Sequence, residues 1–275
     1  MLKLLLLNAL LPAVAVAQVA TNSSEGNPGS VSKMPYGQVI KSCTTPGAFA
    51  LTFDDGPFEF TMTLLDTLKA AGVKATFFIN GNNFDRVENR VPELKRMLDE
   101  GHQIGSHTDK HPDFNKISGQ QVREEMTTLD EKLIKLINKS PTYMRPPFFH
   151  TTNESLKVLA EMQYHVINAD LDSFDWNFTT PENNNEAFKN FQAKFDNSTM
   201  SLMHDVHKTT VELLVPKVLP ILKDSGRTAM TVGECLGDPK ENWYRNGPVK
   251  DATPATGVKP VQSADCKRKR DVAPV

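Results

Sequence analysis

In the stretch AFALTFDDGP, residues 48–57, an apolar run leads directly into two carboxylates and a tight turn. The run 48–53 is short and apolar, which is typical of a buried strand. Asp54 and Asp55 follow at its end, and the Gly-Pro pair turns the chain at once. By itself such a turn is as consistent with a plain surface loop as with a functional site, so the rest of the chain has to decide.

Six further apolar runs follow the first one along the chain. They are 74–79, 103–107, 143–146, 165–171, 201–204 and 229–232. Helical segments lie between these runs. Strands that alternate with helices predict an α/β fold with a parallel sheet in a single domain. Periodicity alone leaves open whether the sheet closes into a barrel or stays an open, doubly wound sheet.

Three of the helical segments carry clear local signals. In 61–71, apolar residues recur on one face and Gly72 follows as a stop signal. The segment 118–137 opens with Ser118, a favourable N-cap. The segment 211–223 contains Pro216 and Pro220, and the two prolines predict a kinked or divided helix.

The composition is that of a soluble globular protein. The 275 residues carry a formal net charge of -2, with 23% charged and 39% hydrophobic residues. This near-neutral balance gives no electrostatic footprint for nucleic acid. No glycine-rich phosphate loop follows a strand, which disfavours nucleotide binding.

The N-terminal end has the pattern of an export signal. Lys3 precedes an apolar run that ends in Ala15 and Ala17, so residues 1–17 are predicted to be a signal peptide cleaved after Ala17. A membrane anchor is the alternative, but the run is shorter than the roughly 20 apolar residues that a spanning helix needs. We therefore expect no membrane association after cleavage and a flexible segment over 18–39. Five Asn-x-Ser/Thr sites support export as candidate glycosylation sites: Asn22, Asn138, Asn153, Asn177 and Asn197.

Three cysteines in an exported chain predict one disulfide and one remaining thiol. Cys43 precedes the first strand-like run and Cys235 follows the last, so a bond between them would join the two ends of the folded domain. Cys266 lies beyond, in a stretch without apolar periodicity. The tail 241–275 is predicted to be extended or disordered. Its basic run 267–270 is a solvated charge cluster or, alternatively, a proteolytic processing site.

Polar and ligand-type residues also follow the later apolar runs. His107 and His111 follow the third run, Arg145 the fourth, Asp172 and Asp175 the fifth, and His204 ends the sixth. In a parallel α/β barrel all these strand ends lie on one rim, where active sites are built. Residues far apart in the sequence would then meet in one cleft.

The HTDKH stretch suits a metal ion, because His107 and His111 stand four apart. On one helical turn this spacing puts two imidazoles on the same face. With an aspartate from another strand they would make a three-ligand site, and three protein ligands with an open position are typical of a catalytic metal. A pair of surface histidines is the alternative.

The other three clusters are weaker signals. In RPPFF, 145–149, two prolines stiffen the loop and leave the Phe148 N–H free for a ligand. In DSFDW, 172–176, Trp176 suits a sugar ring but suits core packing equally. In SLMHDVH, His204 is a candidate general acid. The remaining histidines are assigned no role: His102, His150, His165 and His207.

Taken together, the five clusters resemble, in order and spacing, the motifs of the polysaccharide deacetylases of carbohydrate esterase family 4, also called the NodB homology domain. The resemblance covers roughly residues 40–240. Cys43 and the run 232–247 resemble the fungal chitin deacetylases more specifically. The resemblance implies a deformed (β/α) barrel and a bound metal ion, usually Zn²⁺, with Co²⁺ as a possible substitute.

The resemblance also implies a role for each matching residue. Asp55, His107 and His111 match the metal ligands, and Asp54 matches the general base. The other matches are His204 to the general acid, Arg145 to the residue that orients the base, Asp175 to the partner of the acid, and Leu202 and Trp176 to the apolar walls of the acetyl pocket. Phe148 stands where the family usually has Tyr, and its backbone N–H is expected to contact the oxyanion. Phe149 stands where many relatives have Gly.

The function implied is hydrolysis of N-acetyl groups on N-acetylglucosamine units of chitin or chitin oligosaccharides, which gives chitosan and acetate. The enzyme is expected to be a monomer, secreted to the medium or the cell wall. One alternative keeps the chemistry and changes the polymer to peptidoglycan or acetylxylan. Another is a secreted chitin-binding protein without catalysis, and the complete set of base, metal ligands and acid argues against it.

Overall fold

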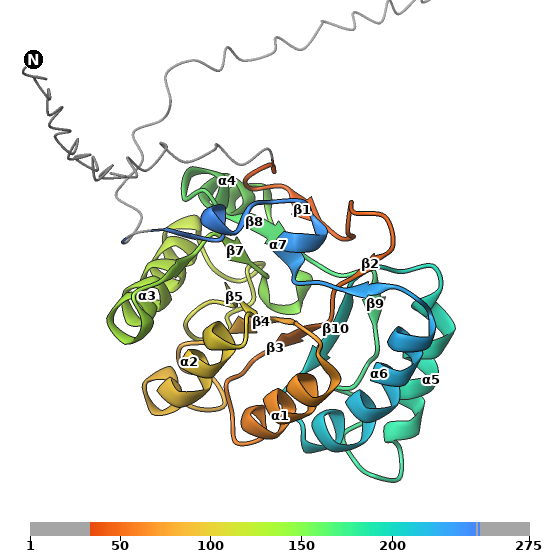
Figure 1. Cartoon of the computed structure of the whole chain (residues 1–275). Helices are drawn as coiled ribbons and strands as arrows, with labels where there is room; N and C mark the ends of the chain where they lie inside the picture. Colours follow the sequence, from red (N-terminus) through yellow and green to blue (C-terminus); the bar gives the residue numbers. More distant parts are fainter. Residues whose placement is uncertain (1–33, 246, 248–275) are drawn as a thin grey trace, which may run out of the picture. The chain divides into compact units, whose positions relative to one another are not determined.

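The structure is a computed structural model that describes residues 34–245 and residue 247 (Figure 1). The predicted signal peptide, Asn22, Cys266 and nearly all of the predicted tail lie outside the described residues. The described chain is organised around a parallel sheet of eight strands. In the order of their neighbours these are β1 (Val39–Ile40), β8 (His165–Ile167), β7 (Tyr143–Met144), β5 (Gln103–Ser106), β4 (Thr76–Ile79), β3 (Thr52–Asp54), β10 (Ser201–His204) and β9 (Leu171–Asp172).

One apolar run of the sequence shows that the sheet is curled. The run 165–171 forms two strands, β8 and β9, and these pair near opposite edges of the sheet. Only residues 168–170 join them. Because so short a link cannot cross a flat sheet of eight strands, the two edges must approach each other. The sheet is therefore a curled, incompletely closed barrel, which decides between the two α/β architectures that the sequence left open.

Helices α1 (Thr61–Ala71), α2 (Val91–Asp99), α3 (Gly119–Ile137), α4 (Asn153–Glu161), α5 (Asn184–Phe195) and α6 (Val215–Asp224) lie around the outside of this curled sheet (Figure 1). The short α7 (Val232–Cys235) instead lies at the amino end of the strands, where the Val232 and Gly233 N–H groups donate to Thr76 and Gln103. Helix α1 buries Leu64, Leu65 and Leu68 against the sheet and ends at Gly72, which is left-handed with φ +66°. Helix α3 begins at Ser118, whose side chain accepts the Gln121 N–H in a capping box. The predicted stop and start signals are both confirmed.

The proline-containing segment is divided, as its sequence predicts. A π-helical turn, Thr210–Leu214, precedes α6, and Pro216 stands in the first turn of α6. The last apolar run, 229–232, is predicted to be a strand, and this prediction is wrong for most of its length. Only β11 (Thr228–Ala229) is extended, pairing with β2 (Ala48–Phe49), because Thr231 then caps α7 through the Glu234 N–H.

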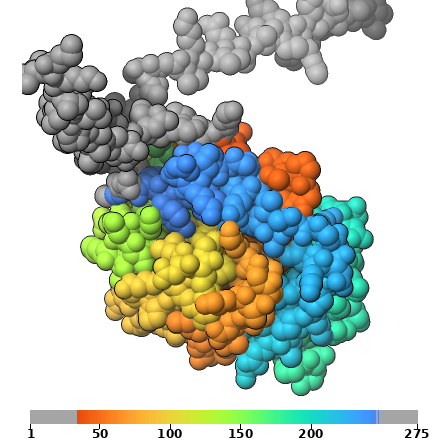
Figure 2. Space-filling model, viewed as in Figure 1, coloured from red at the N-terminus to blue at the C-terminus, as the bar shows by residue number. Residues whose placement is uncertain are grey.

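The predicted tail begins too early at residue 241. A 3₁₀ turn, Lys240–Asn242, leads into β12 (Tyr244–Arg245), which pairs with β6 (Ser140–Pro141). Trp243 is buried, and the Tyr244 hydroxyl accepts the Ile104 N–H at 2.8 Å. Figure 2 shows the blue C-terminal residues packed into the surface beside the yellow and cyan parts of the chain. Single side chains anchor this segment, so it has no periodicity that the sequence could reveal.

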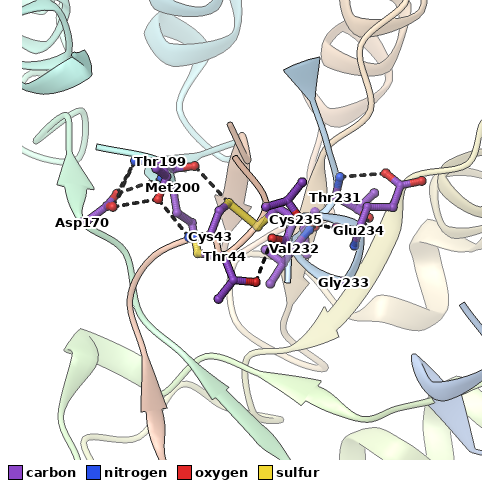
Figure 3. The surroundings of a disulfide bond; sticks show 12 residues. Cys43, Thr44, Asp170, Thr199, Met200, Thr231, Val232, Gly233, Glu234 and Cys235 are labelled. Atoms are coloured by element: carbon purple, nitrogen blue, oxygen red, sulfur yellow. Dashed lines mark hydrogen bonds between the residues drawn. A yellow bond between two sulfur atoms is a disulfide. The ribbon is translucent and has the colours of Figure 1, made fainter. Parts of the chain in front are cut away.

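A disulfide joins Cys43 and Cys235, as their positions in the sequence predict, with Cα atoms 5.1 Å apart. It lies in a hydrogen-bonded junction at the amino ends of β9 and β10 (Figure 3). The Cys43 N–H donates to the Thr199 hydroxyl at 2.9 Å, and the Asp170 carboxylate accepts the N–H groups of Thr199 and Met200. This junction, Cys43, Asp170, Thr199, Met200 and Cys235, is called the disulfide junction below.

Two surface properties bear on export. Within the described ranges, no helix is long and apolar enough to cross a membrane. The four described asparagines of the glycosylation motifs are all exposed: Asn138, Asn153, Asn177 and Asn197.

Candidate active site

The carboxyl ends of the strands surround a cleft of about 440 Å³. Its lining residues come from five separate segments of the chain, and most of them are residues that the sequence singled out. They are Asp54, Asp55, His107, His111, Pro146, Phe148, Phe149, His150, Asp172, Trp176, Leu202 and His204. The expected convergence of distant residues at one rim is therefore present.

Arg145 anchors Asp54 from beneath the cleft. Its side chain is fully buried, and Nη1 donates to Asp54 Oδ1 at 2.7 Å and to the Thr52 hydroxyl at 2.6 Å. The other guanidinium nitrogens donate to the carbonyls of Ile167 and Asn168, at 3.2 and 2.9 Å. One carboxylate oxygen of Asp54 is thus held by a charged donor, while the other is 3.8 Å from His107 Nε2.

Burial sets the protonation of Asp54. Desolvation raises the pKa of its carboxyl, and the nearby Arg145 charge opposes the rise without cancelling it. A carboxylate whose pKa moves up from its usual value toward neutrality is a better proton acceptor at neutral pH. The position of Asp54 therefore suits proton transfer.

Asp55, His107 and His111 place their ligand atoms within 4.8 Å of one another. The Nε2 atoms of His107 and His111 are 3.6 and 3.4 Å from Asp55 Oδ1. His107 Nδ1 lies 2.7 Å from the Arg145 carbonyl. Because a carbonyl can only accept, Nδ1 carries the proton and Nε2 presents its lone pair to the other two ligands.

The charges of this trio fit a cation. Burial lowers the pKa of His107, and burial lowers the pKa of His111 to about 4, so both rings are neutral at pH 7. Burial raises the pKa of Asp55 to about 6. Two neutral imidazoles and one carboxylate form a set of three ligands with no positive charge among them, and this is the donor set of an open metal site. The three residues form a candidate metal site.

The two histidines do not lie on a helical turn, which corrects the expectation from their spacing. They lie on the loop after β5, where Thr108 and His111 have φ of +72° and +58°. The His111 N–H donates to the Thr108 hydroxyl, and Asn80 Nδ2 donates to the Thr108 carbonyl, both at 3.0 Å. The left-handed residues fold the loop back, so the imidazoles meet without a helix.

His204 and Asp175 form a second charged pair across the cleft. Asp175 is fully buried and accepts the His204 N–H at 2.7 Å, while its other oxygen is 2.9 Å from His204 Nδ1. Thr210 Oγ1 also donates to Asp175 at 2.7 Å. Burial alone would lower the pKa of His204, but Asp175, with Asp55 and Asp54, outweighs it and raises the pKa to about 10. His204 is therefore protonated at neutral pH.

Apolar and backbone groups complete the cleft. Phe148 has φ +59°, and its N–H forms no hydrogen bond within the described part of the chain. The Trp176 side chain is half exposed and its Nε1 donates to Asp172 at 3.4 Å, while Leu202 is only 7% exposed. An unpaired backbone donor, an indole and a buried leucine thus face the same space as the ionisable groups.

Several contributors to the site were missed. His150 lines the cleft, with Nδ1 2.9 Å from Asp113, although the sequence assigned it no role. Asn83 donates to Asp55 at 3.4 Å. Asp205 is buried next to His204, accepts the Thr61 hydroxyl at 2.5 Å, and has its pKa raised to about 7 by burial. The position of Asp205 directly after His204 is the one feature of the sequence that could have placed it near the site.

A curled parallel sheet whose carboxyl-end rim carries an open three-ligand site, an anchored carboxylate and a protonated histidine defines a metal-dependent hydrolase. The chain belongs to the polysaccharide deacetylase family. The family model matches residues 41–167.

The relatives agree with this assignment. A chitin deacetylase of Pestalotiopsis sp is 46% identical over 217 residues, which is 78% of this chain and 72% of that relative. A probable peptidoglycan-N-acetylglucosamine deacetylase of Arthroderma benhamiae is 43% identical, covering 82% of this chain and 52% of that relative. The solved structure of the chitin deacetylase from the fungal pathogen Colletotrichum lindemuthianum matches with a TM-score of 0.76 and 41% identity, over 78% of this chain and 97% of that one.

Proposed function

We propose that this protein hydrolyses N-acetyl groups of N-acetylglucosamine units in chitin or chitin oligosaccharides, giving chitosan units and acetate. The observation that carries the proposal is the cleft itself. It holds an anchored carboxylate, Asp54, and a protonated histidine, His204, on either side of one candidate metal site. Hydrolysis of an amide needs a proton acceptor for water and a proton donor for the leaving nitrogen. The names of the fungal relatives support chitin as the polymer.

Asp55, His107 and His111 would hold the cofactor, for which we propose Zn²⁺, with Co²⁺ as a substitute. When bound, such an ion supplies Lewis acidity to the acetamide oxygen and lowers the pKa of a water molecule. The hydrogen bond of His107 Nδ1 to the Arg145 carbonyl would orient its ring for this ligand role.

The protein groups would then divide the proton transfers. Asp54 accepts a proton from the attacking water while Arg145 keeps its carboxylate in place. The Phe148 N–H donates to the carbonyl oxygen as negative charge develops there. His204 gives its proton to the nitrogen as acetate leaves, and Asp175 orients the ring and stabilises its charged form. Trp176 and Leu202 would enclose the acetyl methyl group.

The same proposal covers the export, the domain bounds and the glycosylation of the protein. Residues 1–17 would act as a signal peptide, residues 39–245 would form the catalytic domain, and the enzyme would work as a secreted monomer outside the cell or in the wall. The exposed asparagines at 138, 153, 177 and 197, together with Asn22, would carry glycans. The relatives also include a probable peptidoglycan-N-acetylglucosamine deacetylase, so peptidoglycan is the second candidate substrate.

Acetate release separates these possibilities. We expect release from chitin oligosaccharides, its loss with a chelator, and its recovery with Zn²⁺ or Co²⁺. Peptidoglycan and acetylxylan are the parallel substrates. Preferred release from either of them would replace chitin as the substrate, and binding of chitin oligosaccharides without any release would favour the non-catalytic binder.

The two adjacent aspartates provide the sharpest test of the roles. Asp54→Asn removes the proton acceptor and keeps the shape, so turnover should fall by about 10²–10⁴-fold while zinc content and oligosaccharide binding persist. Asp55→Asn and His107→Ala should lose zinc as well as activity. Zinc content, oligosaccharide affinity and acetate release are measured for all three variants. If Asp54→Asn lost the metal while Asp55→Asn kept it, the two roles would have to be exchanged.

A further inference from the structure

Helix α3 contacts the loop that carries two of the proposed metal ligands, although none of its residues lines the catalytic cleft. This loop, residues 107–111, is called the metal loop below. It has His107 and His111 at its two ends, and both Thr108 and His111 have positive φ, an unfavourable conformation for residues other than glycine. The shape of the metal loop therefore depends on contacts from outside it.

The first contact is an ion pair at the middle of the metal loop. Lys132 Nζ, on α3, donates to Asp109 Oδ1 at 2.6 Å. Asp109 is only 2% exposed, and the Lys132 side chain is 21% exposed. A charge-assisted hydrogen bond that is largely shielded from solvent holds its partners more firmly than an ion pair on the open surface.

The second contact lies two helical turns earlier on α3. Glu125 Oε2 accepts the Lys110 N–H at 2.7 Å. Residues 125 and 132 are seven positions apart, so they project from the same face of the helix. One helix face thus binds two consecutive residues of the metal loop, and both of these residues lie between the two histidines.

The loop after β4 holds the metal loop from another side. The N–H groups of Gly81 and Asn82 donate to the Asp109 carbonyl at 3.0 and 2.6 Å. A Cβ atom at Gly81 would overlap with the Asp109 carboxylate, so this carboxylate packs directly against the Gly81 backbone. Asp109 is therefore held between α3 and a neighbouring loop.

We propose that Lys132 and Glu125 are positioning residues for the metal ligands, because they hold the metal loop in the shape that turns His107 and His111 toward Asp55 before an ion binds. The inference rests on the metal site of the proposed function and deepens it. Ligands that are already in place lose little conformational freedom on binding, so the two contacts raise the affinity for Zn²⁺. Neither residue touches the ion or the substrate.

The zinc affinity of the metal-free protein tests this role, measured by competition with a chromophoric chelator. Lys132→Met and Glu125→Leu should each weaken zinc binding by about 10- to 100-fold, the usual effect of removing a group that supports a ligand. Lys132→Arg keeps the charge and Glu125→Gln keeps an acceptor for the Lys110 N–H, so both should stay within about threefold of the wild-type affinity. At saturating Zn²⁺ the kcat of Lys132→Met should return to within about twofold of the wild-type value, because other residues hold Asp54 and His204.

Lys135→Met and Glu131→Gln are the matched controls, because both residues are exposed on α3. They should leave the zinc affinity unchanged. Lys132→Met leaves the buried Asp109 charge without its partner, so the double variant Asp109→Asn with Lys132→Met is measured beside it. The double variant should bind zinc as weakly as Lys132→Met and unfold at a temperature closer to that of the wild-type protein.

The thermal unfolding midpoint of each metal-free variant separates positioning from general stability. Unchanged zinc affinity in Lys132→Met and Glu125→Leu, at whatever unfolding midpoint, would show that α3 only stabilises the fold and would overturn the positioning role.

Zinc binding and acetate release are measured separately, so the two proposals can fail separately. If the wild-type protein bound zinc with the expected losses in the variants but released no acetate, the positioning role would stand and the deacetylase would fail. If the wild-type protein released acetate while both variants kept its zinc affinity, only the positioning role would fail. A wild-type protein that bound no zinc would overturn the positioning role together with the proposed metal site.

Discussion

The two ends of the curled sheet are built in opposite ways. At the carboxyl end, Asp54, Arg145 and Asp175 are buried charges, and the backbone has positive φ at several non-glycine residues: Asp55, Thr108, His111, Phe148, Phe149 and Phe174. At the amino end, the disulfide junction ties Cys43 to Cys235, and Asp170 accepts two backbone N–H groups. The carboxyl end holds buried charges and strained backbone that lower stability, and the amino end holds a disulfide and hydrogen bonds that restrain the strands.

The difference shows where the stability that supports the site comes from. A non-glycine residue held at positive φ costs of the order of 1 kcal/mol or more, and such residues cluster at functional sites. Six of them at one rim require compensation elsewhere, and the amino end supplies covalent and hydrogen-bonded restraints. Substitutions at the carboxyl end should therefore act mainly on turnover, and substitutions at the amino end mainly on unfolding.

Arg145 is the residue expected to break this division, and it should give the largest effect. Arg145→Met leaves the Asp54 carboxylate buried without its partner, which should lower the free energy of unfolding by about 3–5 kcal/mol. The same change should reduce turnover by at least about 10²-fold, because the base loses its anchor. Urea unfolding and acetate release measure the two effects. Arg145→Lys keeps the charge and loses the planar guanidinium, so its stability and turnover should both lie between those of the wild-type protein and Arg145→Met. Wild-type stability in Arg145→Met would contradict the assignment.

The disulfide provides the complementary change at the amino end. Cys43→Ser with Cys235→Ser frees two residues 192 positions apart, and we expect a loss of about 2–5 kcal/mol in the free energy of unfolding. The site lies at the opposite end of the strands, so kcat measured well below the unfolding midpoint should stay within about twofold. Cys266→Ser is the control and should change neither quantity. A large fall in kcat for the double variant, without unfolding, would show that the junction positions the catalytic groups.

The smallest expected change concerns the alkaline limit of activity. Asp175 and the other carboxylates hold the pKa of His204 at about 10 against the effect of burial, so the acid keeps its proton through neutral pH. Asp175→Asn removes the largest favourable charge. The pKa of His204 should then fall, and activity should be lost at a lower pH than in the wild-type enzyme.

The pH profile of kcat/KM measures this shift. The acidic limb, which reports deprotonation of Asp54, should move little in Asp175→Asn. Thr210→Val is the matched variant, because it removes only the hydroxyl that donates to Asp175 at 2.7 Å and keeps the charge. An unchanged alkaline limb in Asp175→Asn would remove His204 from the role of general acid.

The sequence predicted the class of fold and most of the cleft because both depend on local patterns. Apolar runs mark β3, β5 and β10, and a residue of the cleft lies at or just after the end of each of these strands. The pairs Asp54–Arg145 and His204–Asp175 were expected from a family resemblance, since no local signal joins residues 91 and 29 positions apart.

The errors have a common cause, which is that single long-range contacts override local patterns. The spacing of His107 and His111 suggested a helical turn, but left-handed residues braced by Asn80 place them on a loop. The segment after Gly237 has no periodicity, yet Trp243 is buried in the fold. His207 ends the SLMHDVH motif without an assigned role and Phe84 lies in no motif, and only the folded chain places Phe84 against His207 and His207 against His204.

The guanidinium of Arg145 has one further consequence, for the redesign of this scaffold. Besides holding Asp54, it hydrogen-bonds the carbonyls of Ile167 and Asn168, at the start of the short crossing that bridges the open side of the sheet. A single side chain thus holds the link between β8 and β9 and also opposes the rise in the pKa of Asp54. Tuning the pKa of Asp54 would therefore require changes at other charged groups that act on it, such as Asp175, because replacing Arg145 would also remove its hydrogen bonds to the crossing. The same constraint makes the barrel and its chemistry hard to transplant separately.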